Sequence, residues 1–173
     1  ADQLEGLIWR GRLRAMAGDF DGSVGGFRAA GRLDPDHFDA RHFYAKSIAS
    51  QKPRESFAEL LHLRERHPDN QVVAFAAATL LHSQNRLREA RTALSDLIQR
   101  NPRDSVALTE LGLVCLSEGN YEEAQLHLDQ ALRIDPNDAR AHEAMSRCLR
   151  ALGKPDESKK HLEIFLRLDA ARN

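Results

Sequence analysis

The 173-residue sequence lacks the features that identify several classes of protein. It holds only two cysteines, Cys115 and Cys148, which are too few for a disulfide framework and have no metal-binding spacing. Its 25 basic residues are balanced by 26 acidic ones, which disfavours a general nucleic-acid or anionic-membrane binder. The longest apolar run, from Val72 to Leu81, is broken by Thr79 and is too short to span a bilayer. We therefore expect a soluble protein without membrane insertion or a nucleic-acid partner.

The sequence shows no recognisable targeting signal. No signal peptide is visible and the first residue, Ala1, is not a methionine, so we interpret the chain as a piece of a longer protein. The compartment stays open, with the cytoplasm favoured.

The stretch GDFDGSVGGFRAAGRLDP, residues 18–35, is rich in glycine and invites comparison with a phosphate-binding loop. A Walker loop needs a Lys-Ser/Thr pair after its last glycine, and a dinucleotide loop follows a buried strand. Here Phe27 and Arg28 follow the glycines, and no strand-like run precedes them. Gly25 and Gly26 fall inside a predicted helix. Each of these glycines destabilises that helix by about 1 kcal/mol relative to alanine. The stretch is therefore interpreted as part of a repeat and not as a phosphate site.

The same eighteen-residue pattern returns four more times. Its copies start at Gly18, Gln51, Asn85, Gly119 and Gly153, which are separated by 33, 34, 34 and 34 residues. Such a fixed period is the signature of a repeat architecture. In each copy, apolar residues recur at three- and four-residue spacing on both sides of a turn, which predicts two helices. The predicted units are approximately 4–37, 38–70, 71–104, 105–138 and 139–172, in a single array over 1–173.

Prolines and small residues fit this division. Pro35, Pro68, Pro102 and Pro136 are predicted to close second helices, while Pro53 and Pro155 stand just inside them. Small residues predict where the two helices of a unit cross closely: Gly11, Ala45, Ala78, Gly112 and Ser146 in first helices, and Ser23, Ser56, Ala90, Ala124 and Ser158 in second helices.

The first unit departs from the apolar pattern. Arg10 and Arg14 occupy positions where the other units have apolar core residues. We therefore expect a shifted register in which Trp9, Leu13 and Met16 carry the packing of the first helix.

The 34-residue period, with Leu111, Gly112, Cys115, Ala124, Leu128, Ala131 and Pro136 in order, resembles the tetratricopeptide repeat family. The resemblance extends over nearly the whole chain and is best in the fourth unit. It implies an all-α fold, a right-handed α-solenoid of five helix-turn-helix repeats. It also implies that the first helices line a concave face on which peptides or partner domains bind.

No residue pattern indicates an enzyme or a cofactor. His142 and Glu143 resemble the start of a zinc-protease motif, but no second histidine follows, and we expect the histidines to lie on surfaces or in grooves. Cys115 and Cys148 are predicted to pack as small core residues. Acidic residues at the starts of second helices are explained by the helix dipole. We therefore expect no catalytic, cofactor-binding or metal-binding residues.

Carried over by position, the resemblance places the candidate partner-binding surface on one stripe of each first helix. The middle stripes are apolar and the outer ones tend to be basic, so the expected partner is a protein or peptide with apolar anchors and acidic flanks. The first stripe also includes Ile8. The candidate residues are Arg12, His42, Lys46, Val72, Phe75, Thr79, His82, Val106, Thr109, Leu113, Leu116, Arg140, Glu143, Arg147 and Arg150.

Two other functions remain open at this point: substrate recruitment within a larger enzyme, and RNA binding by helical repeats. A further surface is predicted on the last helix, where Ile164, Leu166 and Leu168 accompany the predicted core residues Leu162 and Phe165. Because solenoid ends normally have a polar cap, we expect self-association or a further stretch of chain to cover this helix.

Overall fold

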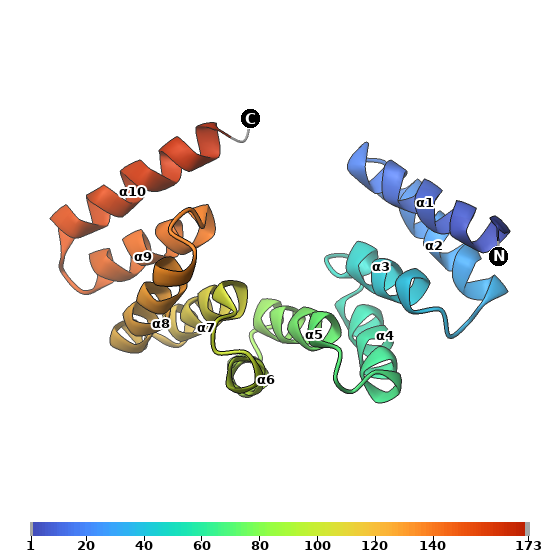
Figure 1. The fold of residues 1–173 in the computed structure, drawn as a ribbon, viewed down its shortest axis with the longest axis horizontal. Helices are drawn as coiled ribbons and strands as arrows, with labels where there is room; N and C mark the ends of the chain where they lie inside the picture. Colours follow the sequence, from blue (N-terminus) through green and yellow to red (C-terminus); the bar gives the residue numbers. More distant parts are fainter. Residues whose placement is uncertain (1, 172–173) are drawn as a thin grey trace. The chain divides into compact units, whose positions relative to one another are not determined.

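The computed structural model describes residues 2–171, and these residues form ten α-helices and no strand (Figure 1). This confirms the predicted all-α fold of helix-turn-helix repeats. The boundaries of the five repeats remain a prediction. The helices are α1 (Asp2–Met16), α2 (Phe20–Leu33), α3 (Phe38–Ile48), α4 (Pro53–Arg66), α5 (Gln71–Ser83), α6 (Leu87–Arg100), α7 (Ser105–Glu118), α8 (Tyr121–Ile134), α9 (Ala139–Ala151) and α10 (Pro155–Ala170).

Helix ends follow the local chemistry of the sequence. α4 and α10 begin at Pro53 and Pro155, where proline's missing N–H breaks no helical hydrogen bond. The side chains of Asp104 and Asp138 accept hydrogen bonds from backbone N–H groups in the first turns of α7 and α9. The second helices α2, α4, α6 and α8 each end two residues before a proline, as predicted.

The turns inside the repeats depend on a left-handed residue. Gly18, Gly119 and Gly153 have φ values of 79°, 80° and 73°, and Asn85 has a φ of 59° at the matching position. Only glycine, and to a lesser degree asparagine, adopts this conformation at low cost. The described part of the second repeat has no such residue, in keeping with its shorter period.

All ten small residues of the predicted crossings are buried, and close contacts confirm the crossings in the first, second, fourth and fifth repeats. A Cβ on Gly11 would lie 2.7 Å from the Phe27 ring, and a Cβ on Gly112 would lie 2.7 Å from Cγ of Leu128. These positions hold glycine because the facing helix leaves no room for a side chain. In other repeats serine serves the crossing, as where Ser56 donates a hydrogen bond to the Ala45 carbonyl at 2.8 Å.

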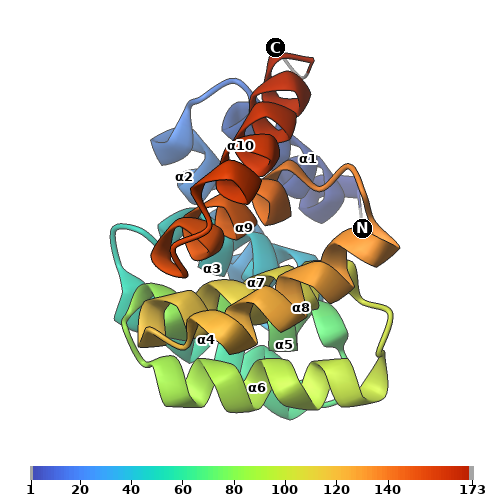
Figure 2. The ribbon, with the colours of Figure 1, turned by 90° about the vertical axis from the view of Figure 1, so that its left-hand side faces the viewer.

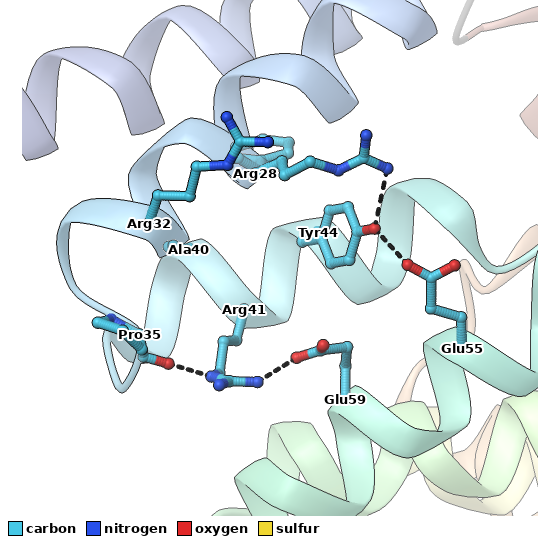
Figure 3. Close-up of a pocket in the computed structure, with 10 residues that line it drawn as sticks. Arg28, Arg32, Pro35, Ala40, Arg41, Tyr44, Glu55 and Glu59 are labelled. Carbon is cyan, nitrogen blue, oxygen red and sulfur yellow. Dashed lines mark hydrogen bonds and ion pairs between the residues drawn. The ribbon is translucent and has the colours of Figure 1, made fainter.

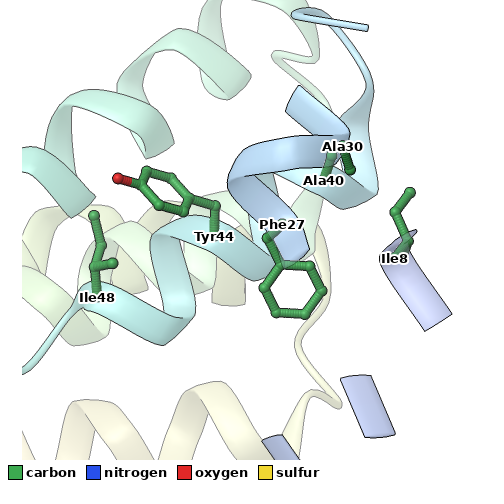
Figure 4. Close-up of a cluster of buried hydrophobic side chains, with 6 residues drawn as sticks. All are labelled: Ile8, Phe27, Ala30, Ala40, Tyr44 and Ile48. Atoms are coloured by element: carbon green, nitrogen blue, oxygen red, sulfur yellow. The ribbon is translucent and has the colours of Figure 1, made fainter. Parts of the chain in front are cut away.

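The chain forms two compact units, one ending at Leu80 and the other beginning at Leu81. In the first unit, Phe27 of α2 lies between α1 and α3, where Ile8 and Ile48 are also buried (Figure 4). A second cluster in this unit joins α3, α4 and the start of α5 through Leu60, Leu63 and Val73, among others.

The packing of α1 corrects one prediction. Trp9, Leu13 and Met16 are 55%, 59% and 85% exposed, so they do not carry the packing of this helix. Ile8, which was expected on the binding stripe, is only 3% exposed and belongs to the core. The register is fixed by the close contact between Gly11 and Phe27, which turns Ile8 inward and leaves Trp9 and Leu13 outside.

The second unit repeats one packing step from α6 through α7, α8 and α9 to α10 (Figure 2). Leu94, Leu108, Leu128 and Leu149 are each no more than 1% exposed. In contrast to the prediction, Leu162 of α10 is not a core residue, because 42% of it is exposed, and Phe165 is half-buried. No described helix follows α10 to cover them.

Candidate partner-binding surface

In the first unit, the predicted residues Arg12 and Lys46 border a cleft between α1, α2 and α3. The cleft has a volume of about 470 Å³, and Arg12 and Lys46 both belong to the predicted stripes. The remaining lining is largely apolar near α1 and α2 and polar near the end of α3. It consists of Ala15, Met16, Phe20, Phe27, Phe43, Ser47, Ser50 and Gln51.

Aromatic rings hold Arg12 at this position. Its guanidinium lies 4.6 Å from the centroid of the Trp9 ring and 5.2 Å from that of Phe43. Phe43 in turn stacks on the buried Phe27 at 5.4 Å. A cation placed against aromatic faces keeps its charge and its hydrogen-bond donors for a ligand. Lys46 is also exposed, so the cleft combines an apolar floor with two cations.

His42 is unlike the other predicted residues of the first unit. Its ring stacks on Phe38 at 5.8 Å and meets the edge of Phe43 at 5.5 Å, and its Nδ1 is buried without a hydrogen-bond partner. Burial, and then the positive charge of Lys46, hold the pKa of His42 below its ordinary value, although Asp39 opposes them. His42 is therefore a neutral group at pH 7 that packs beside the cleft.

The predicted residues on α5 are unevenly exposed. Val72 is 57% exposed, whereas Phe75 and Thr79 are half-buried. Thr79 donates its hydroxyl to the Ala76 carbonyl of the same helix at 3.0 Å. On this helix the most accessible apolar group of the stripe is therefore Val72.

On α7 the stripe is apolar but interrupted. Val106 is 54% exposed and Leu113 and Leu116 are half-buried. Thr109, expected on the accessible surface, is only 2% exposed, and its hydroxyl donates to the Asp138 carboxylate at 2.8 Å. Because Asp138 caps α9, Thr109 is occupied in joining α7 to that cap. The prediction that Thr109 lies on an accessible surface is therefore wrong.

A buried acid that sequence reasoning missed joins three of the predicted stripes. Glu110 of α7 is 1% exposed, with one carboxylate oxygen 2.7 Å from Nδ1 of His82 and the other 2.6 Å from Arg140. The second ring nitrogen of His82 lies 3.0 Å from the Ser117 hydroxyl. His82 and Arg140 are therefore engaged within the protein.

The protonation of Glu110 follows from these partners. Burial raises its pKa, but the hydrogen bond from His82 and the charge of Arg140 outweigh burial, so the pKa lies below the ordinary value. The carboxylate is ionised at neutral pH and holds its two partners in place. On α9, Arg147 and Arg150 are exposed and Glu143 is half-buried, so the two arginines form the accessible part of that stripe.

A separate pocket of about 260 Å³ lies between α2, α3 and α4 of the first unit (Figure 3). Arg28 donates to the Tyr44 hydroxyl at 3.2 Å, and that hydroxyl donates to Glu55. Arg41 pairs with Glu59 at the other side of the pocket. The hydrogen bond from Tyr44, followed by contact with Lys52, lowers the pKa of Glu55. These polar and charged side chains pair with one another across α2, α3 and α4. The pocket therefore has the features of a structural contact between these helices.

One histidine is buried, against expectation. His142 is 6% exposed, and its Nε2 donates to the Pro136 carbonyl at 3.0 Å because a carbonyl can only accept. Its Nδ1 therefore accepts from Nδ1 of His161, 2.9 Å away. Burial, and then the nearby His142, lower the pKa of His161. The pair joins α9 to α10.

In the described part of the chain, no helix is both long enough and apolar enough to cross a membrane.

Comparisons with known proteins match this architecture. Two tetratricopeptide repeat profiles match residues 75–139 and 116–170. No curated protein matches the chain. Among solved structures, Pseudomonas aeruginosa PilF is 21% identical with a TM-score of 0.82, over 96% of this chain and 76% of its own. Residues 41 to the end of MamA from Desulfovibrio magneticus RS-1 are 12% identical with a TM-score of 0.78, over 100% and 98% of the two chains. A tetratricopeptide repeat protein from Parabacteroides merdae is 20% identical with a TM-score of 0.73, over 96% and 67%.

Proposed function

Because the chain belongs to the tetratricopeptide repeat family, we propose that it is a non-catalytic scaffold that binds a protein or peptide through its first helices. Stacked helical repeats support protein interaction with the extended surfaces that they create. The finer proposal concerns where the partner binds and what it looks like.

The cleft beside Arg12 and Lys46 supports this proposal most directly. Its apolar lining, with Met16 85% exposed and Phe20 60% exposed, offers area to an apolar anchor. The two cations at its border attract carboxylates next to that anchor. We therefore propose a partner segment with an apolar side chain in the cleft and acidic residues beside it.

Accessible groups on the other first helices are proposed as further partner contacts, each within its own unit. Val72 and Val106 offer exposed apolar area, and Leu113 and Leu116 offer part of theirs. Arg147 and Arg150 supply positive charge on α9. Thr109 is buried and no longer belongs to this set. His82 and Arg140 contact the buried Glu110, so we propose that they hold the neighbouring helices in place and do not contact the partner.

The test combines partner capture with matched variants. The purified chain, carrying a photo-crosslinking residue at Met16, is used to capture the partner, with Leu126 as the control position because it is 53% exposed on α8. Binding of the captured partner is then measured for Met16→Ser, Leu113→Ala, Arg147→Ala and the control Leu126→Ser.

We expect Met16→Ser and Leu113→Ala to weaken binding by roughly 1–3 kcal/mol, since buried apolar anchors usually dominate affinity. Arg147→Ala should weaken it less and flatten the salt dependence. Equal affinity of Met16→Ser, Leu113→Ala and the parent, with all variants folded by circular dichroism, would refute the proposed surface.

We also propose that a second chain covers α10, at Ile164, Leu166 and Leu168. The repeat gives the reason: Leu60, Leu94 and Leu128 precede Leu162 at 34-residue intervals and are at most 3% exposed, whereas Leu162 is 42% exposed. Each earlier residue lies on a second helix that is followed by a described first helix. Sedimentation at increasing concentration should show association of the parent and less association of Leu166→Gln. A monomer at all concentrations would contradict self-association.

A further inference from the structure

Three different metal-binding side chains converge between α7 and α8. The Sγ of Cys115, a carboxylate oxygen of Glu123 and a ring nitrogen of His127 all lie within 4.8 Å of one another. Glu123 and His127 are four residues apart on α8, so both project from the same face of the helix. Cys115 lies one turn before the end of α7, on the side that packs against α8. The turn at Gly119 folds the two helices together and produces this cluster.

We propose that these three residues form a zinc site. Thiolate, imidazole and carboxylate are the ligand types that zinc uses in proteins, and a set with sulfur and nitrogen disfavours magnesium and calcium. Ligands at ordinary zinc bond lengths of about 2.0–2.3 Å lie roughly 3.5 Å apart in a tetrahedral site. Nε2 of His127 is already 3.7 Å from Oε1 of Glu123. A modest rotation of the side chains would bring the three ligands to that spacing, with water as the fourth ligand.

Two further observations support the site. Nδ1 of His127 is buried and has no hydrogen-bond partner, so this imidazole is not committed to another structural role through that atom. Glu123 and His127 are half-buried while Cys115 is fully buried, which leaves an approach for the ion from the surface side. The site therefore has both an inner ligand and an accessible border.

The surrounding charges suit a divalent ion. Arg91 of α6 contacts both Glu118, at 2.6 Å, and Glu123. With a neutral thiol, these two carboxylates and one guanidinium leave one negative charge in excess. Binding of Zn²⁺ forms a bond to Sγ and releases the thiol proton to water, and the cluster then becomes neutral. Arg91 stays paired with Glu118 and holds the second shell in place.

The protonation of the thiol sets the pH dependence. Zinc binds the thiolate form of cysteine, whereas a cysteine without a bound ion is mostly a protonated thiol at neutral pH. The ion must therefore displace one proton at neutral pH. Isothermal titration calorimetry with zinc, repeated in buffers of different ionisation enthalpy, should report about one released proton per bound ion.

Cobalt provides a second readout because it replaces zinc and reports thiolate ligation by its charge-transfer absorption. We expect the full chain to bind one Co²⁺ with a thiolate band, which zinc then displaces. The variants Cys115→Ser, Glu123→Gln and His127→Gln should each weaken binding by more than the roughly 10- to 100-fold that outer-shell changes cost. The matched control is Cys148→Ser, which removes the other buried cysteine and should leave the band intact.

Folding must be separated from ligation in these variants. Cys115 is fully buried, whereas His127→Gln and Glu123→Gln change half-buried groups, so the last two carry the test if Cys115→Ser does not fold. The proposal is overturned if the folded parent shows no cobalt–thiolate band. It is also overturned if the band depends on Cys148, or if it survives in both His127→Gln and Glu123→Gln.

Discussion

The two units of the chain pack their helices in the same way, but their sequences match the tetratricopeptide repeat pattern to different degrees. Both tetratricopeptide repeat profiles match only from residue 75 onward, which leaves most of the first unit outside them. Yet Phe27 in the first unit and Leu128 in the second are equally well buried at matching positions, each against a glycine of the preceding helix. The helix crossing therefore survives where the wider sequence pattern has been lost.

The two units differ on the helix faces that lie outside this crossing. Arg10 and Arg14 of α1 are exposed, whereas the corresponding Met145 and Leu149 of α9 are 1% exposed. α9 packs against α8 on one side and α10 on the other, but no described helix precedes α1. Among the described residues, α1 therefore carries exposed arginines where α9 has core residues, and Met16 of the same helix lines the cleft.

Truncation of the matched core residues should give the largest effects. We expect Phe27→Ala to lower the free energy of unfolding by about 3–5 kcal/mol and Leu128→Ala by about 2–5 kcal/mol, because each leaves a cavity at a close crossing. Hydrogen exchange should assign the loss of protection to α1–α3 for Phe27→Ala and to α7–α9 for Leu128→Ala. Loss spread equally over the whole chain in both variants would show that the units do not respond separately.

Overpacking of a crossing should have the next largest effect. Ala124 is fully buried, and its carbonyl lies 3.5 Å from where a Cβ on Gly112 would be. Ala124→Leu should cost about 1–3 kcal/mol because α7 and α8 must separate to fit the larger side chain. Arg133→Ala, an exposed change on the same helix, should stay within about 0.5 kcal/mol. Similar denaturant midpoints for the two variants would contradict the crossing.

A smaller effect should appear on acidification, once in each unit. His42 and His161 both have pKa values held below the ordinary one, mainly by burial, so the unfolded chain binds protons more readily than the folded one. The stabilisation is therefore present above about pH 6.5 and is lost as the pH falls through the lowered pKa values. Denaturant melts between pH 7.5 and 5 should show this loss, and His42→Gln and His161→Gln should each flatten it. An unchanged pH dependence in the double variant would reject this assignment.

The smallest predicted effect is a gain in stability that separates two neighbouring glycines. A Cβ on Gly25 would meet nothing within 4 Å, so Gly25→Ala should stabilise α2 by up to about 1 kcal/mol. A Cβ on Gly26 would lie 3.2 Å from Cα of Gly11 and 3.3 Å from the Leu7 carbonyl. Gly26→Ala should therefore lose that gain. If both alanines stabilise the protein equally in thermal melts, α1 and α2 are not in close contact at Gly26.

The sequence was most informative where local spacing decides the outcome. The period, the proline positions and the small pairs such as Gly112 and Ala124 follow from contacts within one repeat, which recur five times and can be compared. The predicted register shift of α1 is wrong, because Arg10 and Arg14 are exposed at their unshifted positions. The structure instead keeps the register and exposes Trp9 to solvent, where its ring packs under Arg12.

Contacts that occur only once were beyond this kind of prediction. Glu110 falls at a position where Ala144 stands in the next repeat, and nothing in its neighbourhood in sequence announces His82 or Arg140 as partners. Cys115, Glu123 and His127 likewise have no recognised ligand spacing, because a turn between two helices brings them together. Such groups require the positions of side chains on different helices.

Glu110 also limits how this gene segment can change by duplication. Its carboxylate needs His82 from the repeat before it and Arg140 from the repeat after it. If the fourth repeat were copied in tandem, the Glu110 of the first copy would face Val106 of the second copy in place of Arg140, and the Glu110 of the second copy would face Leu116 of the first in place of His82. Each copy would then bury a carboxylate with one of its two partners missing, at a cost of several kcal/mol. The repeats look interchangeable by their period, but this one acid fixes the order of three of them.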